Sequence, residues 1–185
     1  MQSIELSIKG ISPLMLSAEA PYEDTGGSTG PKKRQEKPSD QARSHLHLVK
    51  MNGRGELAVL PAINLQKSIQ AAHSFMPARK KGWKKFINGC LVLSPTHLVL
   101  EPQVWTVDAR RTSGANGRGG PINYRPRFDA WAVNATLSFD ERFLSEEEAR
   151  AFVDLAGQYV GVGSWRVGVG GPFGKYIVTG WNVTA

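Results

Sequence analysis

The sequence is poor in cysteine and has no long hydrophobic run. Cys90 is the only cysteine, which excludes an internal disulfide and any zinc site built from several cysteines. Apolar residues never continue for the roughly 18 positions that a membrane-spanning helix needs, so we expect no transmembrane helix and no membrane partner. Residues 1–10 alternate between apolar and polar types instead of forming a basic patch and an apolar block. We therefore expect no secretory signal and a cytoplasmic protein.

Acidic residues are scarce in the middle of the chain. Residues 57–128 hold eleven Lys or Arg but only Glu101 and Asp108, a net charge of +9 in a chain whose total is +7. Dense basic patches most often neutralise phosphate groups, so this separation of charge predicts a surface that faces a polyanion. The alternative is a solvated basic face that has no partner.

Alternating apolar and polar residues predict a chain with many strands. Ile4, Leu6 and Ile8 alternate with polar residues, which is the period of a half-buried strand. Turn residues at Asn52 and Gly53 separate two apolar runs and favour a hairpin between 45–49 and 57–60. Further extended segments are expected over 91–93, 97–100, 104–111, 124–139 and 177–181.

Two helices are expected among these strands. Pro61 suits the first turn of a helix, and the apolar residues after it, Ile63 and Phe75 among them, recur at helical spacing. Ser145 and Glu148 form a capping box, which predicts the start of a second helix. The order strand, helix, strands, helix, strand predicts an α+β, ferredoxin-like fold. This is also the layout of RNA-recognition-motif domains, a sheet with helices on one face.

Three segments are expected to lie outside the regular elements of a single domain, 1–185. Residues 17–43 are poor in apolar residues and predict a flexible basic loop. Residues 77–89 form a basic insertion after the first helix. The extended segments around 112–121 predict a long basic β-hairpin with a flexible, glycine-rich tip over those residues.

Four arginines lie on the two strands of the expected hairpin: Arg110, Arg111, Arg125 and Arg127. Because neighbouring strand residues point to opposite faces, we expect one arginine of each pair to lie on the opposite face. We favour Arg110 and Arg125 as contacts to a nucleic-acid backbone. The alternative, for Arg111 and Arg127 above all, is a salt bridge to the acidic helix around residues 146–148.

Further basic residues cluster around an indole and in two polar segments. Lys80, Lys81, Lys84 and Lys85 surround Trp83, a composition typical of a single-strand groove, where lysines contact phosphates and an aromatic ring stacks a base. A core position is the alternative for Trp83. Other predicted nucleic-acid contacts lie in the early loop, as an arm that orders on binding, and at the hairpin tip: Lys32, Lys33, Arg34 and Arg118.

A glycine-rich loop, 161–175, precedes the last strand, and Gly161 is expected to end the second helix. Glycine loops that bind nucleotides precede a helix whose amino terminus faces the phosphate, so we reject that function here. The glycines permit close approach of the backbone to a ligand or to a neighbouring strand. We therefore expect Trp165 and Arg166 to contact RNA, with simple packing of the loop on the sheet as the alternative.

Five short motifs together resemble a known family. They are 10–15 (GISPLM), 107–111 (VDARR), 125–128 (RPRF), 161–166 (GVGSWR) and 171–176 (GPFGKY). Their spacing is similar to that of the repeat-associated mysterious protein (RAMP) superfamily, and in particular to small phage-encoded relatives of the CRISPR effector-complex backbone subunit. The resemblance implies an RNA-recognition-like core that polymerises along single-stranded RNA through backbone contacts. It also implies a homo-oligomer or filament, with CRISPR-type subunits as further partners in a bacterial cell.

The sequence thus predicts a non-enzymatic, sequence-independent protein that binds single-stranded RNA or DNA, with RNA preferred and without catalytic residue, cofactor or metal. Two alternatives stay open. RAMP relatives include endoribonucleases, which makes His45, His47 and His73 candidates for an acid or base, and Asp24 or Asp40 candidates for a metal-assisted site. The other alternative is a protein-interaction or decoy subunit that blocks a host CRISPR complex.

Overall fold

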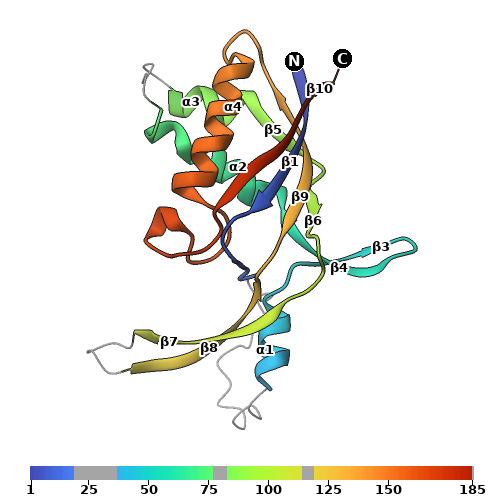
Figure 1. The fold of residues 1–185 in the computed structure, drawn as a ribbon, viewed down its shortest axis with the longest axis vertical. Helices are drawn as coiled ribbons and strands as arrows, with labels where there is room; N and C mark the ends of the chain where they lie inside the picture. Colours follow the sequence, from blue (N-terminus) through green and yellow to red (C-terminus); the bar gives the residue numbers. More distant parts are fainter. Residues whose placement is uncertain (19–36, 77–82, 114–118, 185) are drawn as a thin grey trace, which may run out of the picture.

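The computed structural model describes residues 1–18, 37–76, 83–113 and 119–184. Its largest sheet has four antiparallel strands in the order β10-β1-β9-β5 (Figure 1). The first strand lies inside the sheet because it pairs with β10 on one side and with β9 on the other. The strands are β1 (Gln2–Gly10), β5 (Leu91–Ser94), β9 (Ala132–Phe139) and β10 (Tyr176–Thr184).

Helices cover one face of this sheet. Figure 1 shows α2 (Ala62–Ala71), α3 (Trp83–Cys90) and α4 (Glu146–Leu155) on the same side of its strands. Ile4, Leu6 and Ile8 of β1 are buried, with Leu65 of α2 and Phe152 of α4 in the same hydrophobic core. The alternation predicted for the first strand is confirmed, and it decides which face of the sheet packs against the helices.

The middle of the opposite face of the sheet is polar, whereas Val92 of β5 and Ile177 of β10 are exposed towards its edges. Glu5 pairs with Thr136 and Ser7 pairs with Asn134, so the residues between the core positions of β1 and β9 lie side by side. None of these four side chains is aromatic or basic. The difference between the two faces fixes the register of the strands, because a shift by one residue would expose the core positions.

Local sequence signals place the helices. The Ser145 hydroxyl accepts a hydrogen bond from the Glu148 amide at 3.2 Å, and the Glu148 carboxylate accepts one from the Ser145 amide at 3.1 Å, so the predicted capping box is confirmed. The short 3-10 helix η1 (Ala72–Ser74) extends the first predicted helix. Its predicted apolar face is wrong at two positions, because Ile63 is 50% exposed and Phe75 is 44% exposed. Phe75 stacks on Tyr159, with 5.2 Å between the ring centroids, whereas Leu65 is buried in the core.

Two smaller antiparallel sheets flank the main one. One has the order β2-β8-β7 and contains the long predicted hairpin, and the other has the order β3-β4-β6 and contains the predicted early hairpin. Figure 1 shows the β7–β8 hairpin at the end of the molecule opposite the two chain termini. The strands are β2 (Leu14–Met15), β3 (Leu48–Met51), β4 (Gly55–Pro61), β6 (His97–Val99), β7 (Thr106–Ser113) and β8 (Gly119–Phe128).

The structure corrects four expected boundaries. The end of the expected loop 17–43 is helical, since Pro38 begins α1 (Pro38–Ser44), and proline suits a first helical turn. The strands of the hairpin extend into the expected tip 112–121, and the insertion 77–89 contains most of α3. The extended segment 124–139 is two strands, β8 and β9, in different sheets. The rest of the two expected loops and of the tip, 19–36, 77–82 and 114–118, lies outside the described residues.

The end of α4 leads into the glycine-rich loop as expected. A π-helical turn, η3 (Ala156–Val160), follows α4, and Gly161 ends it with a φ of +70°, where glycine is favoured. A short 3-10 helix, η4 (Val167–Val169), lies inside the loop. None of the helices in the described part of the chain is long and apolar enough to span a membrane.

Candidate functional site

The glycine-rich loop lies between the hairpin sheet and α2. The Ser164 amide donates to the Met15 carbonyl at 2.8 Å, which attaches the loop to β2, the strand that pairs with β8. On the other side, the Ser68 hydroxyl of α2 donates to the Gly161 carbonyl at 2.7 Å. Basic side chains from the hairpin and from α2 are therefore brought to the two sides of one loop.

Glycine at position 163 is what permits this close docking. Gly163 has a φ of +80°, and a Cβ atom there would lie 2.5 Å from the Met15 carbonyl oxygen. Among the residues that the structure describes, Trp165, two residues later, is the one that has a positive φ, +52°, without being glycine. Such strained backbone is kept only where the surroundings determine it, and it is common at binding sites. The Trp165 side chain is 42% exposed.

The hairpin register places three arginines on one face. Asp108 pairs with Arg125, and Arg110 pairs with Asn123, so these residues share a face. Arg127 lies two residues from Arg125 and therefore also shares this face, which makes the expectation that alternation separates them wrong. Arg111 lies on the opposite face and is exposed, as alternation predicts.

A buried carboxylate, Asp108, organises this arginine face. Asp108 is 6% exposed and accepts hydrogen bonds from the Arg110 Nε at 2.5 Å and the Arg127 Nη1 at 3.2 Å. The hydrogen bond from Arg110, followed by its charge and by the contacts from Arg127, holds the pKa of Asp108 below its usual value despite burial. Arg127 also pairs with Asp129 at 2.8 Å. The expected alternative partners at 146–148 are wrong for Arg127, because its partners are these two aspartates.

Arg125 differs from its neighbours in having a neutral partner. Its Nη1 donates to the Ser164 hydroxyl at 2.6 Å, which joins the hairpin to the loop. Its Nε is buried and has no hydrogen-bond partner among the described residues. The three arginines and two aspartates of this face sum to +1, and Arg125 is the arginine whose charge no described carboxylate pairs.

Trp165 completes a small hollow over the arginine face. The Arg110 guanidinium lies over the rings of Trp165 and Phe173, at 5.2 Å and 4.8 Å from their centroids. A cavity of about 30 Å³ is lined by Met15, Asp108, Arg110, Asn123, Arg125 and Trp165. Cation–π contact fixes the indole beside the arginines, so an aromatic surface and a cationic surface are adjacent.

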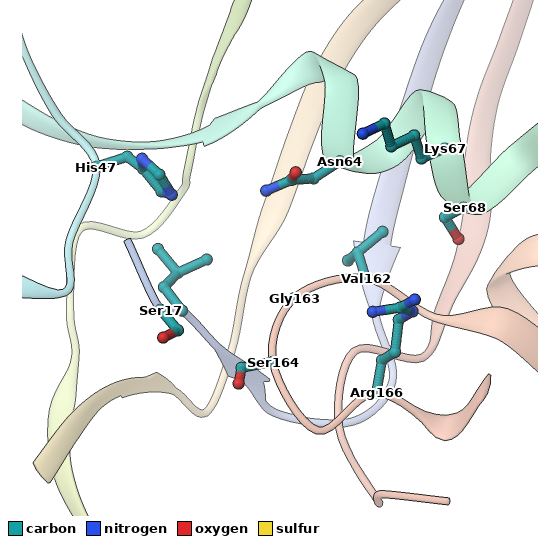
Figure 2. A pocket seen from close by; sticks show the side chains of 10 residues that line it. Ser17, His47, Asn64, Lys67, Ser68, Val162, Gly163, Ser164 and Arg166 are labelled. Atoms are coloured by element: carbon teal, nitrogen blue, oxygen red, sulfur yellow. The ribbon is translucent and has the colours of Figure 1, made fainter. Parts of the chain in front are cut away.

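A larger cavity lies on the other side of the loop. It has a volume of about 270 Å³ and separates α2 from residues 162–166 of the loop. Figure 2 shows Asn64 projecting from α2 toward His47, and Arg166 extending from the loop toward the helix. None of its ten described lining residues is acidic: Leu16, Ser17, His47, Asn64, Lys67, Ser68, Val162, Gly163, Ser164 and Arg166.

Lys67 and Asn64 were missed from the sequence as site residues. Lys67 is isolated from the basic clusters, so its charge gave no local signal. The available signal was spacing: Asn64 and Lys67 are three residues apart on a predicted helix and therefore share a face. Only the docking of the loop against α2 brings Arg166 to that face.

The second predicted basic cluster lies far from this loop. Lys84 and Lys85 are exposed on α3, at the end of the molecule opposite the hairpin (Figure 1). Trp83 begins α3, and its side chain lies outside the described part of the structure. The structure therefore gathers Arg110, Arg125, Arg127, Trp165 and Arg166 but not these two lysines. The remaining candidates lie outside the described residues: Lys32, Lys33, Arg34, Lys80, Lys81 and Arg118.

The candidate histidines have different surroundings. His45 Nδ1 lies 3.0 Å from the Ala18 carbonyl and His73 Nδ1 lies 2.9 Å from the Gln70 carbonyl, so both rings make local backbone contacts. Only His47 of the three lines the larger cavity. Burial and the nearby His97 lower the pKa of His47. In the described residues no group of three or more His, Cys, Asp or Glu side chains could hold a metal ion, and Asp24 lies outside them.

Two comparisons with known proteins found no relative. No protein-family model matches the chain, and a search of curated proteins returns no match. The resemblance to RAMP proteins stays a prediction from the five sequence motifs.

Proposed function

We propose that the chain binds single-stranded nucleic acid, with RNA preferred, mainly through phosphate contacts around the glycine-rich loop. The observation that carries this proposal is that three cations gather at the glycine-rich loop: Arg125 of the hairpin lies on one side, Lys67 of α2 lies on the other, and Arg166 belongs to the loop itself. None of these three cations forms a salt bridge with another residue that the structure describes. Unpaired cations gathered at one place favour an anionic ligand.

The arginine face contributes fewer free charges than the sequence suggests. Asp108 pairs with Arg110 and Arg127, and Asp129 also pairs with Arg127. These two arginines therefore serve mainly to position neighbouring side chains and add little net positive charge. Arg110 keeps Trp165 in place, and the exposed part of this indole offers a stacking surface for a base. An aromatic surface next to phosphate contacts favours a single strand, because the bases of a duplex are stacked on each other.

The order of the main elements supports a ferredoxin-like interpretation of the fold. β1, the helices α2 and α3, β5, β9, α4 and β10 follow the β-α-β-β-α-β order of that fold. RNA-recognition motifs stack bases on aromatic residues of the open sheet face. Here that face carries Glu5, Ser7 and polar residues of β9, so we assign the strand to the loop instead. RNA preference and assembly along the strand are proposed on the RAMP resemblance.

Direct binding measurements test the proposal, with mixed-sequence RNA and DNA strands titrated over a series of salt concentrations. Arg125→Gln is expected to weaken binding of all sequences about tenfold, since one charge-assisted hydrogen bond is worth roughly 1.4 kcal/mol or more. The slope of log K against log salt should fall by about 0.7, the value for one lost phosphate contact on a single strand. Size-exclusion chromatography of the same mixtures checks assembly, and electrophoresis of the recovered strand checks that it is intact.

Arg111→Gln is the matched control, because it removes the same charge from the opposite face of the same hairpin. It is expected to leave affinity and salt slope unchanged. Equal losses in the two variants would mean that net charge alone drives binding, and no loss in either would remove the loop from the proposed site. Shortened strands of uniform length would instead support the endoribonuclease alternative.

A further inference from the structure

The cavity between α2 and the loop has a composition that suits one class of ligand. Lys67 and Arg166 bring two positive charges to it, and none of the described lining residues brings a negative one. Asn64, Ser17 and Ser164 add side-chain hydrogen-bond donors. Neutral polar ligands would leave both cations without a counterion, so the cavity favours an anion with several acceptor oxygens.

We propose that this cavity is a binding site for a phosphate monoester, which Lys67 and Arg166 hold from opposite sides. A monoester carries a charge of about −1.5 to −2 near neutral pH and presents three acceptor oxygens. This charge matches the two cations, whereas a backbone diester carries a single charge and has two free oxygens. At about 270 Å³ the cavity greatly exceeds the roughly 30 Å³ of one water molecule, so it has room for a phosphate group.

Neighbouring groups fit the same ligand. Burial and His97 lower the pKa of His47, so its imidazole is neutral at pH 7.5 and offers hydrogen bonding without a third charge. Lys67 is exposed, which leaves the cavity accessible from solvent. Two sources could supply a monoester: the end of a bound strand, or free phosphate and small phosphorylated molecules. The first source rests on the proposed function, whereas the phosphate chemistry of the cavity does not.

The first experiment uses inorganic phosphate on the whole chain without nucleic acid, with the histidine side-chain resonances followed by NMR at pH 7.5. Phosphate is expected to shift the His47 resonances in a saturable way and to leave those of His45 and His73 unchanged. Dimethyl phosphate, a model of the diester, is expected to bind at least tenfold more weakly. No saturable shift of His47, or equal binding of the two probes, would overturn the proposal.

Matched lysine variants identify the cavity as the site of binding. Lys67→Met keeps most of the aliphatic stem and should weaken phosphate binding at least tenfold, whereas Lys50→Met removes an exposed lysine of β3 and should not. Neither change removes a hydrogen bond or salt bridge to another residue in the described part of the chain, and thermal unfolding checks that both variants fold. Equal weakening by the two variants would overturn the proposal.

A second experiment separates the two sources of phosphate. Short RNA strands with a 5′-phosphate, a 3′-phosphate or hydroxyl ends are compared in the wild type and in Lys67→Met. A terminal phosphate that raises affinity at least threefold, with the gain lost in Lys67→Met, assigns the cavity to a strand end. Phosphate binding without any such gain assigns it to a free monoester. If no strand binds at all, the proposed function is wrong. The titration with inorganic phosphate still shows whether the cavity binds a phosphate monoester.

Discussion

At the scale of single residues, Asp108 decides how the basic surface is used. A buried aspartate on the arginine face is not an obvious feature of a phosphate-binding protein, because it cancels charge. Its hydrogen bonds hold Arg110 and Arg127 at fixed positions, and Arg110 in turn lies against Trp165. Asp108 therefore weakens the attraction of this face for anions, but it holds the Arg110 and Arg127 side chains in fixed positions. Arg125 is left as the arginine of that face whose charge no described carboxylate pairs, and we propose that this charge binds a phosphate.

Removal of the Asp108 charge should destabilise the protein in a pH-dependent way. Asp108→Asn is expected to lower the free energy of unfolding at pH 7 by about 1–3 kcal/mol, the usual loss for buried hydrogen bonds to a charged group. The pKa of Asp108 is lowered in the folded state, so its contribution is present above the unfolded value of about 3.9 and is lost as pH falls through the lower folded value.

Urea unfolding at pH 7, 4 and 3 measures this difference. The gap between wild type and Asp108→Asn should shrink from pH 4 to pH 3, because the Asp108 carboxylate of the unfolded chain takes up a proton in this range, whereas the lowered pKa keeps the folded form ionised. Asp129→Asn is the control, since the Asp129 side chain is 56% exposed and its ion pair with Arg127 contributes little. A gap that stays constant with pH would show that the ionised form of Asp108 does not carry the stabilisation.

The residue-scale site could be predicted only in part from the sequence. Alternation along a strand was enough to place Arg110 and Arg125 on one face and Arg111 on the other. The same rule, applied to residues two apart, would have put Arg127 with Arg125. Lys67 gave no local signal, because its partner in the cavity, Arg166, lies in a loop whose docking is a long-range event.

At the scale of elements, the docking of the glycine-rich loop on β2 builds the site. The sequence showed the loop and its end at Gly161, but the surface on which it packs is set by backbone hydrogen bonds to residues 13–15. Local signals predicted the elements with strong periodicity or capping, such as β1 and α4. Short α1 was missed because seven polar and small residues carry no apolar period, and only Pro38 marks its start.

Alanine at position 163 tests the contribution of loop docking. Gly163→Ala adds a Cβ atom 2.5 Å from the Met15 carbonyl oxygen and also strains a φ of +80°. We expect a loss of roughly 1–3 kcal/mol in the free energy of unfolding, together with weaker binding of RNA, because the loop must move from β2. Equilibrium unfolding in urea and a binding titration give the two quantities.

Gly53→Ala is a control for backbone strain alone. Gly53 has a similar φ of +78°, but no atom lies within 4 Å of the position that its Cβ would take. The Gly53→Ala variant should lose less free energy of unfolding than the Gly163→Ala variant and should bind RNA as tightly as the wild type. Equal effects of the two substitutions on both quantities would mean that strain, and not the close contact with β2, accounts for the loss at Gly163.

At the scale of the whole molecule, the predicted basic clusters separate to opposite ends. The charge count over residues 57–128 suggested one polyanion-facing surface, yet Lys84 and Lys85 lie on α3 and the loop site lies beside the hairpin (Figure 1). Basic residues that are close in the sequence can lie far apart in the folded chain. Successive helices and strands run across the sheet in opposite directions, so their ends lie at opposite ends of the molecule. The mixed α+β class followed from the order of elements, whereas the position of each cluster required the tertiary structure.

This separation predicts that the length of the strand decides which cluster matters. The double variant Lys84→Gln with Lys85→Gln should bind a strand of about six nucleotides as tightly as the wild type, because a strand of that size occupies one site. A much longer strand can reach both ends of one molecule or of assembled copies, so its affinity and salt slope should fall in the double variant. Arg125→Gln should weaken both strands. If the double variant loses the short strand and Arg125→Gln retains it, the binding site lies on α3 and not at the loop.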